Sequence, residues 1–544
     1  MMNLNFLPVT KYIFTFALVC QVFGEPIINS WHLEKAGSYA RIWQSIEDET
    51  TEKTTGVITS VSTWDADDFE GRPLIGSQTS PVYAGVQGVS YSDDYVYIKS
   101  TGLGTHTMGP WYDNTDKTEA FPSFPANAAI LYQFPRDLSV YSENYVSSMD
   151  TSSLGTNGLM VDGIPIFNSS DGASYDDAGV WNQDAFFNEG TTFDSANAHQ
   201  AATAHHYHAN PAALRHQLGD SVDYDSSVVF TGLVTNGGNN PYTENFNSEH
   251  SPIIGWVTDG LPMYGPYGYS DPKDSTSTVR RMISGYQMRD GSNGSYDLET
   301  NGRDLLPQWS VDLTPSITST NPTSDGPAVD ETGQYRLGSF IEDYAYKGDL
   351  VSDSAGVAFE LYNDPSSQGD FDEDKYFDLN QFNVRYCVTP EFPNGTWAYF
   401  TSILTDGTPF YPYNVANNYF GDSSLASGVT AIEEDVTIVF DLAENKSPEL
   451  DSISTDNDEV TLVWDGIEGG IYRLDSSTTL EADQWSEGTE FTAAAQEIVL
   501  FDETSLINDE EKTFYRLVRT GISDYDDSEF SSGGGGGPGG GGPP

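Results

Sequence analysis

The histidines of this chain are few and unevenly spread. Five of its eight histidines fall within the stretch AHQAATAHHYHANPAALRH, which ends at residue 216. Within it, His206 and His208 are separated by a single tyrosine. Side chains two residues apart on a β-strand point to the same face, so both imidazole rings could bind one metal ion while Tyr207 points the other way. We therefore expect His206 and His208 to be the principal ligands of a metal site.

Three further histidines complete the candidate ligand set. His199 lies in the same stretch, His106 lies in the turn-rich segment GTHTMGPW, and His250 directly follows Glu249. Glu249 could serve as a ligand or as a general base. His205 could add a ligand or hold another ligand in place. The candidate metal ligands are His206, His208, His199, His106 and His250.

The types of ligand narrow the choice of metal. A site rich in imidazole suits a divalent transition metal, copper or zinc above all. The HExxH pattern is absent and no pair of cysteines is available, so neither zinc-protease nor zinc-finger spacing is matched. Clustered histidines can also be surface or hydrogen-bonded groups that hold no metal, and this alternative stays open.

Calcium is a second candidate ion, because acidic residues are abundant. Residues 370–374 (DFDED) resemble the start of a calcium loop, but Lys375 replaces the required glycine and Gln381 the terminal glutamate. We therefore expect no EF-hand there. Other oxygen ligands could come from Glu342, Asp343, Asp372, Glu373 and Glu391.

Other patterns have both a functional and a structural interpretation. The arginines at positions 280, 281, 289 and 303 could clamp an anionic substrate or could pair with carboxylates inside the protein. The pattern Asp-Gly-x-Pro begins at Asp162, Asp259 and Asp406, and it predicts either a repeated tight turn or carboxylates around a shared site. We expect the structural interpretation in both cases, and we expect Cys387 to be a buried, inert thiol.

The composition excludes several classes of function. The chain has 23 Lys and Arg against 82 Asp and Glu, which gives a formal net charge of -59. Such a charge repels nucleic-acid phosphates and anionic lipid headgroups, so no nucleic-acid partner is expected. Abundant glycine (52), tyrosine (32) and proline (28) are typical of short strands joined by many turns. The expected fold class is mainly β, with few short helices.

Alternating apolar and polar residues locate several elements within this fold. The expected strands are 82–86, 95–98, 228–234 and 253–257, and the expected helices are 39–46 and 211–218.

The N-terminus has the features of a secretory signal peptide. Lys11 precedes an apolar run, and the small Gly24 then marks a cleavage site, so residues 1–24 are expected to be removed. No other stretch approaches about 18 apolar residues, so no transmembrane segment is expected after cleavage. We expect the mature chain to be secreted or at the cell surface. Loss of Cys20 would leave Cys387 without an intrachain disulfide partner.

The remaining chain divides into three expected segments. Residues 28–444 form a large β-rich domain. Strand-like runs at 459–464, 471–474 and 513–518 predict a small fibronectin-like β-sandwich over 448–521. Residues 522–544 are acidic and then rich in glycine and proline, which predicts a disordered tail.

The histidine stretch and several longer segments resemble one family, the YHYH-domain proteins of bacteria. Of that family's motif, His206, Tyr207 and His208 match, whereas its first tyrosine is His205 here. The resemblance implies a YHYH-type domain within residues 28–444 and implies no particular reaction. The other segments that carry it are GTHTMGPW (104–111), SPIIGWVTDGLPMYGPYGY (251–269), RRMISGYQMRDGSNG (280–294), SFIEDYAYKGDL (339–350) and TPEFPNGTWAYF (389–400).

Two functions of different classes fit these features. In the first, the chain is an exported metal-binding protein whose copper or zinc ion could act as a Lewis acid or redox centre. In the second, it is a cell-surface or extracellular interaction protein that binds carbohydrate or protein, with a metal that is only structural. The partner would be an unknown small molecule or a surface glycan. An ion with an open coordination position favours the first function, and a fully enclosed ion favours the second.

Overall fold

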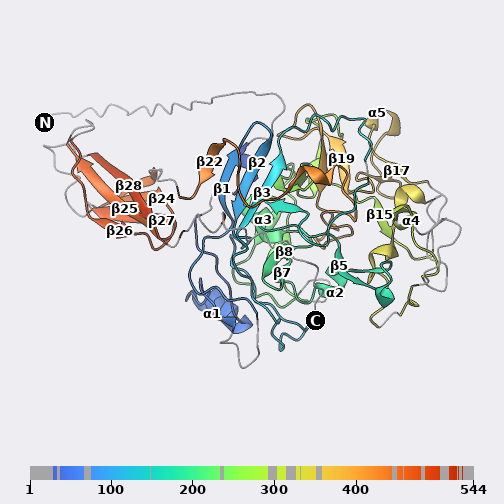
Figure 1. Ribbon diagram of the computed structural model, residues 1–544, viewed down its shortest axis with the longest axis horizontal. Helices are drawn as coiled ribbons and strands as arrows, with labels where there is room; N and C mark the ends of the chain where they lie inside the picture. The colour runs from blue at the N-terminus through green and yellow to red at the C-terminus, as the bar shows by residue number, and fades with distance from the viewer. Residues whose placement is uncertain are drawn as a thin grey trace, which may run out of the picture.

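Short β-strands dominate the computed structural model of this chain, as the sequence predicts (Figure 1). The expected signal peptide with Cys20, and most of the expected Gly/Pro tail, lie outside the described residues. The residues that the structure describes are 28–33, 37–66, 75–147, 149–232, 238–291, 303–313, 326–330, 333–350, 358–443, 450–456, 459–478, 484–502, 514–523, 525 and 530.

One five-stranded sheet joins the beginning and the end of the large β-rich region. Its strand order is β21-β3-β2-β1-β22, and all neighbouring strands are antiparallel. The two strands of this sheet that come last in sequence, β21 and β22, therefore form its two edges, and its centre comes from the first three strands. The strands are β1 (Val86–Tyr91), β2 (Tyr95–Ser100), β3 (Ile130–Pro135), β21 (Ser427–Gly428) and β22 (Thr437–Asp441).

A second five-stranded sheet lies deeper in the protein. Its order is β19-β20-β12-β11-β4, with one parallel pair, β12 with β20. All five residues of its strand β11 are buried, which accounts for the continuous apolar sequence IIGWV. The strands are β4 (Gly158–Met160), β11 (Ile253–Val257), β12 (Pro262–Tyr264), β19 (Val384–Cys387) and β20 (Thr396–Phe400).

Side chains of both sheets share one core. The Trp31 ring stacks on Trp256 with a centroid distance of 4.0 Å, and Phe134 of β3 is fully buried in the same cluster. Tyr207 also belongs to this core, and its hydroxyl donates a hydrogen bond of 3.0 Å to Asp162. The tyrosine of the histidine stretch is therefore anchored in the protein interior.

The remaining elements of the large region are short. No described helix is long and apolar enough to cross a membrane. The paired strands are β5 (Ser170–Ser174) with β6 (Asn182–Asp184), β7 (Ala198–Ala201) with β8 (Ala204–Tyr207), β9 (Val222–Tyr224) with β10 (Tyr242–Glu244), β13 (Tyr267–Tyr269) with β14 (Val279–Arg281), β15 (Tyr286–Met288) with β16 (Tyr344–Tyr346), and β17 (Glu360–Leu361) with β18 (Tyr376–Phe377). The α-helices are α1 (Ile46–Thr55), α2 (Ala185–Glu189), α3 (Ala212–Gln217), α4 (Gln308–Leu313) and α5 (Pro365–Gln368).

Two antiparallel three-stranded sheets follow at the C-terminal side, beside β22 and far from β7 and β8 (Figure 1). They share a core that includes Trp464, Tyr472 and Leu517. A fibronectin-like domain with boundaries at 448 and 521 stays a prediction, and residue 448 lies outside the described part of the chain. One sheet contains β23 (Leu450–Asp456), β24 (Glu459–Asp465) and β27 (Glu497–Asp502), and the other contains β25 (Gly470–Ser477), β26 (Glu490–Thr492) and β28 (Phe514–Ile522).

Glu468 attaches these two sheets to residues 37–41 and to Tyr83 of the large region. Its carboxylate accepts hydrogen bonds from the Tyr39 amide at 3.0 Å and the Arg41 guanidinium at 2.5 Å. Its backbone carbonyl accepts one from the Tyr83 hydroxyl at 2.6 Å, and its amide donates to the Gly37 carbonyl at 2.8 Å. Both the side chain and the backbone of this residue therefore take part in the contact.

In the large β-rich region, three expected elements are found close to their expected places. The strands at 95–98 and 253–257 correspond to β2 and β11, and the helix at 211–218 corresponds to α3. No strand forms over 82–85 or over the described residues 228–232. In the latter segment the backbone pairs instead with side chains of α1, because the Phe230 amide and the Val228 carbonyl bond to Glu49 and Lys53.

The helix expected over residues 39–46 is wrong. Tyr39 and Ile42 form isolated β-bridges, and α1 begins only at Ile46. Ser45 caps it by accepting a hydrogen bond from the Asp48 amide at 3.2 Å. A serine followed by acidic residues is a favourable helix start, and this signal outweighs the weak apolar periodicity before it.

The Asp-Gly-x-Pro repeat forms turns and no shared site. In each copy the aspartate accepts a hydrogen bond from the amide two residues later, at 3.1 to 3.2 Å. The surroundings differ, because Asp162 meets Tyr207, Asp259 meets Tyr399, and Asp406 lies at a partly exposed turn. The structural interpretation of this repeat is therefore the right one.

Candidate metal centre

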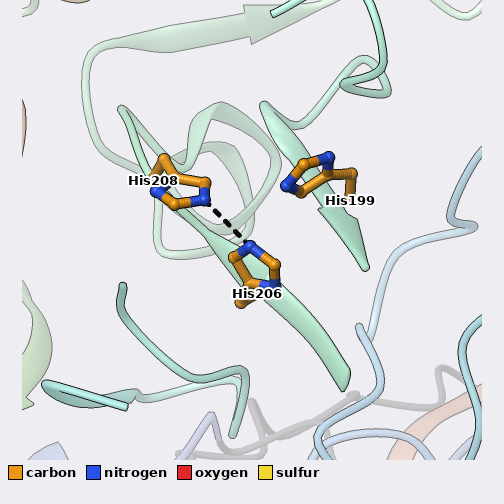
Figure 2. Close-up of side chains that lie close together, drawn as sticks. All are labelled: His199, His206 and His208. Carbon is orange, nitrogen blue, oxygen red and sulfur yellow. Dashed lines mark hydrogen bonds between the residues drawn. The ribbon is translucent and has the colours of Figure 1, made fainter. Parts of the chain in front are cut away.

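A two-residue turn folds the histidine stretch into the β7–β8 hairpin. His199 pairs directly with His206 in the antiparallel register, and Gln200 pairs with His205. Directly opposed residues share a face, so His199 and His206 lie on one face while Gln200 and His205 lie on the other. His208 follows the end of β8, and its ring turns toward His206 (Figure 2).

Three imidazole rings, those of His199, His206 and His208, meet at this hairpin, and we call them the first histidine group (Figure 2). The Nε2 atoms of His206 and His208 are 2.9 Å apart, and the His199 ring centroid lies 4.7 Å from that of His206. All three side chains are buried. One nitrogen from each ring lies within 4.8 Å of the others, so a small shift of the side chains would let all three bind a single ion.

Hydrogen bonds at the far side of each ring fix which nitrogen carries the proton. The Nδ1 atoms of His206 and His208 face the carbonyl oxygens of Ala204 and Asn168, at 2.9 and 2.7 Å. A carbonyl only accepts, so both Nδ1 atoms must carry hydrogen and both neutral Nε2 atoms present a bare lone pair. Two lone pairs at 2.9 Å repel each other unless a cation or an extra proton lies between them.

Thr192 fixes the third ring in the same way. Its hydroxyl donates to the Glu189 carbonyl at 2.7 Å and therefore accepts from Nδ1 of His199, also at 2.7 Å. All three rings of the first histidine group thus leave Nε2 unprotonated.

Glu189, the last residue of α2, brings a carboxylate to the same place. Its Oε2 lies 3.3 Å from Nε2 of His208 and 3.6 Å from Nε2 of His199. This oxygen is buried and has no hydrogen-bond donor among the described residues. Burial, with the nearby carboxylates of Asp171 and Asp184, raises the pKa of Glu189 well above its ordinary value.

Aromatic rings enclose the first histidine group. Phe167 stacks on His206 with a centroid distance of 3.8 Å, and Phe193 packs against both His199 and His208. Burial lowers the pKa of His208 to about 4 and that of His199 and His206 well below the ordinary value. An extra proton is therefore disfavoured here at neutral pH, whereas a metal ion needs these neutral rings.

His106 belongs to a different group, on the other face of the hairpin, with His205 and Asp194. Burial lowers the pKa of His106 to about 4 and that of His205 to about 3, and it raises the pKa of Asp194 to about 7. The structure thus separates His106 from the first histidine group.

His250 belongs to neither group. Its Nδ1 lies 2.7 Å from the Ser251 carbonyl, and its ring packs among the aromatic rings of Tyr264, Tyr269 and Phe400. Its neighbour Glu249 is exposed. Among the described residues, His250 belongs to no group of side chains that could hold a metal ion.

The arginine cluster is paired inside the protein. Arg280 and Arg303 each make two hydrogen bonds to one carboxylate, those of Asp378 and Asp343. The other two arginines also bond within the chain, Arg281 to Glu373 and Ile403, and Arg289 to the carbonyls of Glu342 and Leu305. The structure therefore favours pairing with internal groups over an anion clamp.

The acidic calcium candidates are also engaged with protein donors. Asn182 donates twice to Glu342, Arg303 binds Asp343, and Tyr264 donates to Glu391. Among the described residues, these carboxylates form no group that could hold a metal ion. Cys387 is a buried free thiol whose pKa is raised to about 12 by burial, as expected of an inert thiol.

A comparison with protein families identifies the relatives of this hairpin. The profile of the family described as "YHYH protein" matches residues 132–416, just over half of the chain. The chain belongs to the YHYH protein family. No curated protein and no solved structure matches it.

The YHYH match contains the whole first histidine group, and the sequence resemblance to this family is thereby confirmed. Of the candidate ligands discussed above, His106 alone lies outside the matched residues. The strands β1, β2, β21 and β22 also lie outside the match, although they complete the first sheet.

Three residues of this YHYH protein that matter to the two groups were missed by the sequence analysis. Glu189, Thr192 and Asp194 precede the histidines in one short segment. No spacing rule singles out Glu189 and Asp194 among 82 acidic residues, or Thr192 among the threonines. Their only signal is closeness in sequence to the histidine stretch, through the loop between α2 and β7.

Proposed function

We propose that this chain is an exported metal-binding protein that holds one divalent transition-metal ion in the first histidine group. Nε2 of His199, His206 and His208 would be the nitrogen ligands, and the carboxylate of Glu189 the fourth ligand. Three rings and one carboxylate match the ligand number and types of a four-coordinate ion.

One observation carries this proposal: the two bare Nε2 atoms of His206 and His208, 2.9 Å apart, with both Nδ1 atoms committed to carbonyl groups. Two ligands at about 2.1 Å from one ion can be at most about 4.2 Å apart. The distances of Glu189 Oε2 to His208 and His199, 3.3 and 3.6 Å, also fall within this limit. One ion would replace the lone-pair repulsion by attraction and would supply the missing partner of Glu189.

Zinc and copper are the ions that the ligands favour. Three imidazoles suit both ions. The first histidine group contains no thiolate or thioether, which are the ligands that select softer metals. Calcium prefers six to eight oxygen ligands, so it fits this group poorly.

The enclosure of the site favours a structural role for the ion. Four protein ligands and the rings of Phe167 and Phe193 leave little room for a substrate beside the metal. This observation supports our second candidate function, a cell-surface or extracellular interaction protein in which the metal stabilises the fold. Its partner would be a small molecule or a surface glycan. A catalytic role requires Glu189 to leave the ion and open a position.

Metal analysis of the purified protein tests the proposal. We expect wild type to contain zinc or copper, and the His206→Gln/His208→Gln variant to lose one ion per chain. The matched control is His250→Gln, which removes a half-buried imidazole that belongs to neither group and should keep the wild-type metal content. Equal metal content in wild type and the double variant would reject the first histidine group as a metal site.

The two candidate functions differ in the access that a small ligand has to the ion. The copper-loaded protein would show a changed electron paramagnetic resonance spectrum on addition of azide if a coordination position is open. An unchanged spectrum supports the structural role.

A further inference from the structure

We propose that the chain binds a second divalent first-row transition-metal ion between His106, His205 and Asp194, on the opposite face of β8. We call these residues the second group. This site is separate from that of the proposed function, because neighbouring residues of a strand point to opposite faces. His206 points to the first histidine group, so His205 points away from it.

The second group contains four buried ring nitrogens without a partner. Neither Nδ1 nor Nε2 of His106 has a hydrogen-bond partner among the described residues, and the same holds for both nitrogens of His205. A buried polar atom without a partner costs about 1–3 kcal/mol. Proteins rarely retain such atoms together without a ligand that satisfies them.

The carboxylate of Asp194 is held in place beside these rings. Its Oδ2 accepts a hydrogen bond from the Gly109 amide at 2.9 Å, and its Oδ1 accepts from the amides of Ala196 and Ala198 at 2.9 and 3.3 Å. One ligand atom from each member of the group lies within 4.8 Å of the others. A side-chain shift of less than 1 Å would bring such atoms to metal-ligand distances.

The loop that carries His106 is fixed to the same hairpin. Trp111 donates its indole N–H to the Ala198 carbonyl at 3.1 Å, and its ring meets the His205 ring at 5.7 Å. Gly104 lies directly against His106, since a Cβ at Gly104 would be 2.7 Å from Cε1 of the ring. The position of His106 is therefore set by packing, which is what a preorganised ligand requires.

The ligand types indicate the class of ion. Two imidazoles and one carboxylate suit zinc, and also iron, cobalt and manganese, and leave at least one further coordination position. Gln200 lies on the same face of the hairpin, and its buried Oε1 has no partner among the described residues. This oxygen is a candidate for the further position.

Zinc titration of the full chain after dialysis against a chelator tests the second site. Isothermal titration calorimetry and elemental analysis should both give a stoichiometry of two zinc ions per chain for the wild type. The His106→Gln/His205→Gln variant should bind one, and the His206→Gln/His208→Gln variant should also bind one. The control His216→Gln changes an exposed histidine bonded to the Val222 carbonyl, and this variant should bind two zinc ions.

The outcomes separate the two sites. One ion in wild type that is retained by His106→Gln/His205→Gln would overturn the second site and leave the proposed function intact. If the wild type binds one ion and only His106→Gln/His205→Gln loses it, the result would support the second site and reject the metal site of the first histidine group. Measurements on the wild-type protein test the second site even if a variant fails to fold. If the wild type binds a single ion, and its cobalt spectrum shows three nitrogen ligands, the second site does not exist.

Discussion

Thr192 links the two kinds of ligand in the first histidine group. Its hydroxyl bonds to the backbone of Glu189 and to the ring of His199. The same atom therefore holds the end of α2 close to β7 and sets the tautomer of a candidate ligand. Loss of such an outer contact typically lowers metal affinity by about 10–100-fold.

At the scale of the residue, we predict that Thr192→Val weakens binding at the first site by about 10–100-fold, because His199 would lose the acceptor that keeps Nε2 free. The side-chain volume is nearly unchanged. Competition with a chromophoric chelator measures the affinity. Thr191→Val is the control, since the described contact of Thr191 is a backbone carbonyl that accepts from Lys117. Equal losses in both variants would contradict the assigned role.

Sequence alone identified part of the first histidine group and could not identify the rest. The i, i+2 spacing of His206 and His208 needs only the period of a strand, and His199 lies close by in sequence. Glu189 depends on where a short helix ends, and His106 depends on a loop that packs from about 90 residues away. Local periodicity contains no information about either contact, which is why the sequence places His106 in one candidate set with His206 and His208, whereas the structure places it beside His205 and Asp194.

At the scale of the element, the first Asp-Gly turn positions the second sheet against the first. Gly163 follows the end of β4 with a φ of 82°, and a Cβ there would lie 2.2 Å from Ser100 Oγ and 2.9 Å from the Gly85 carbonyl carbon. The turn that presents Asp162 to Tyr207 therefore fits only because residue 163 has no side chain.

We predict that Gly163→Ala lowers the free energy of unfolding by about 2–4 kcal/mol, from backbone strain plus the close contact with Ser100. Urea-induced unfolding measures the change. The control is Gly179→Ala, where φ is 70° but a Cβ would meet nothing within 4 Å, so strain alone should cost about 1 kcal/mol. A similar loss in both variants would show that the contact contributes nothing.

The elements themselves were partly predictable. Fully apolar or alternating runs gave β2 and β11 because burial on a sheet face leaves a pattern in the sequence. The helix predicted at 39–46 and the strand predicted over the described residues 228–232 do not form, because backbone groups there bond to distant partners. These partners are Val61, Tyr83 and the side chains of α1. Such pairings are tertiary and leave no periodic signal.

At the scale of the whole molecule, buried ionisable groups act in opposite directions on stability. Burial raises the pKa of Asp162 and Glu342 to about 7 and that of Asp184 to about 8. Because these values exceed the unfolded pKa of about 4, their stabilising effect is complete below that pH, falls progressively as pH rises, and is gone above about pH 7 to 8. The buried histidines have lowered pKa values, so their contribution is lost as pH falls below about 6.5.

We therefore predict that the metal-free protein is most stable near pH 6.5 and loses stability between about pH 6.5 and 8.5. Urea unfolding at a series of pH values, with chelator present, measures the slope of the free energy of unfolding against pH. Asp162→Asn should flatten it, whereas Asp406→Asn, in the partly exposed third turn of the same repeat, should leave it unchanged. The prediction is wrong if wild type gains stability over this interval.

The first sheet has a consequence for any attempt to shorten the chain. The matched segment starts inside β3 and ends before β21, so cutting at its limits would separate β3 from both neighbours with which it exchanges hydrogen bonds. The exposed backbone of β3 would then be free to pair with other molecules. We therefore expect that a shortened chain must keep at least β1 to β22, because the matched segment of this chain lies inside a sheet whose first and last strands are paired.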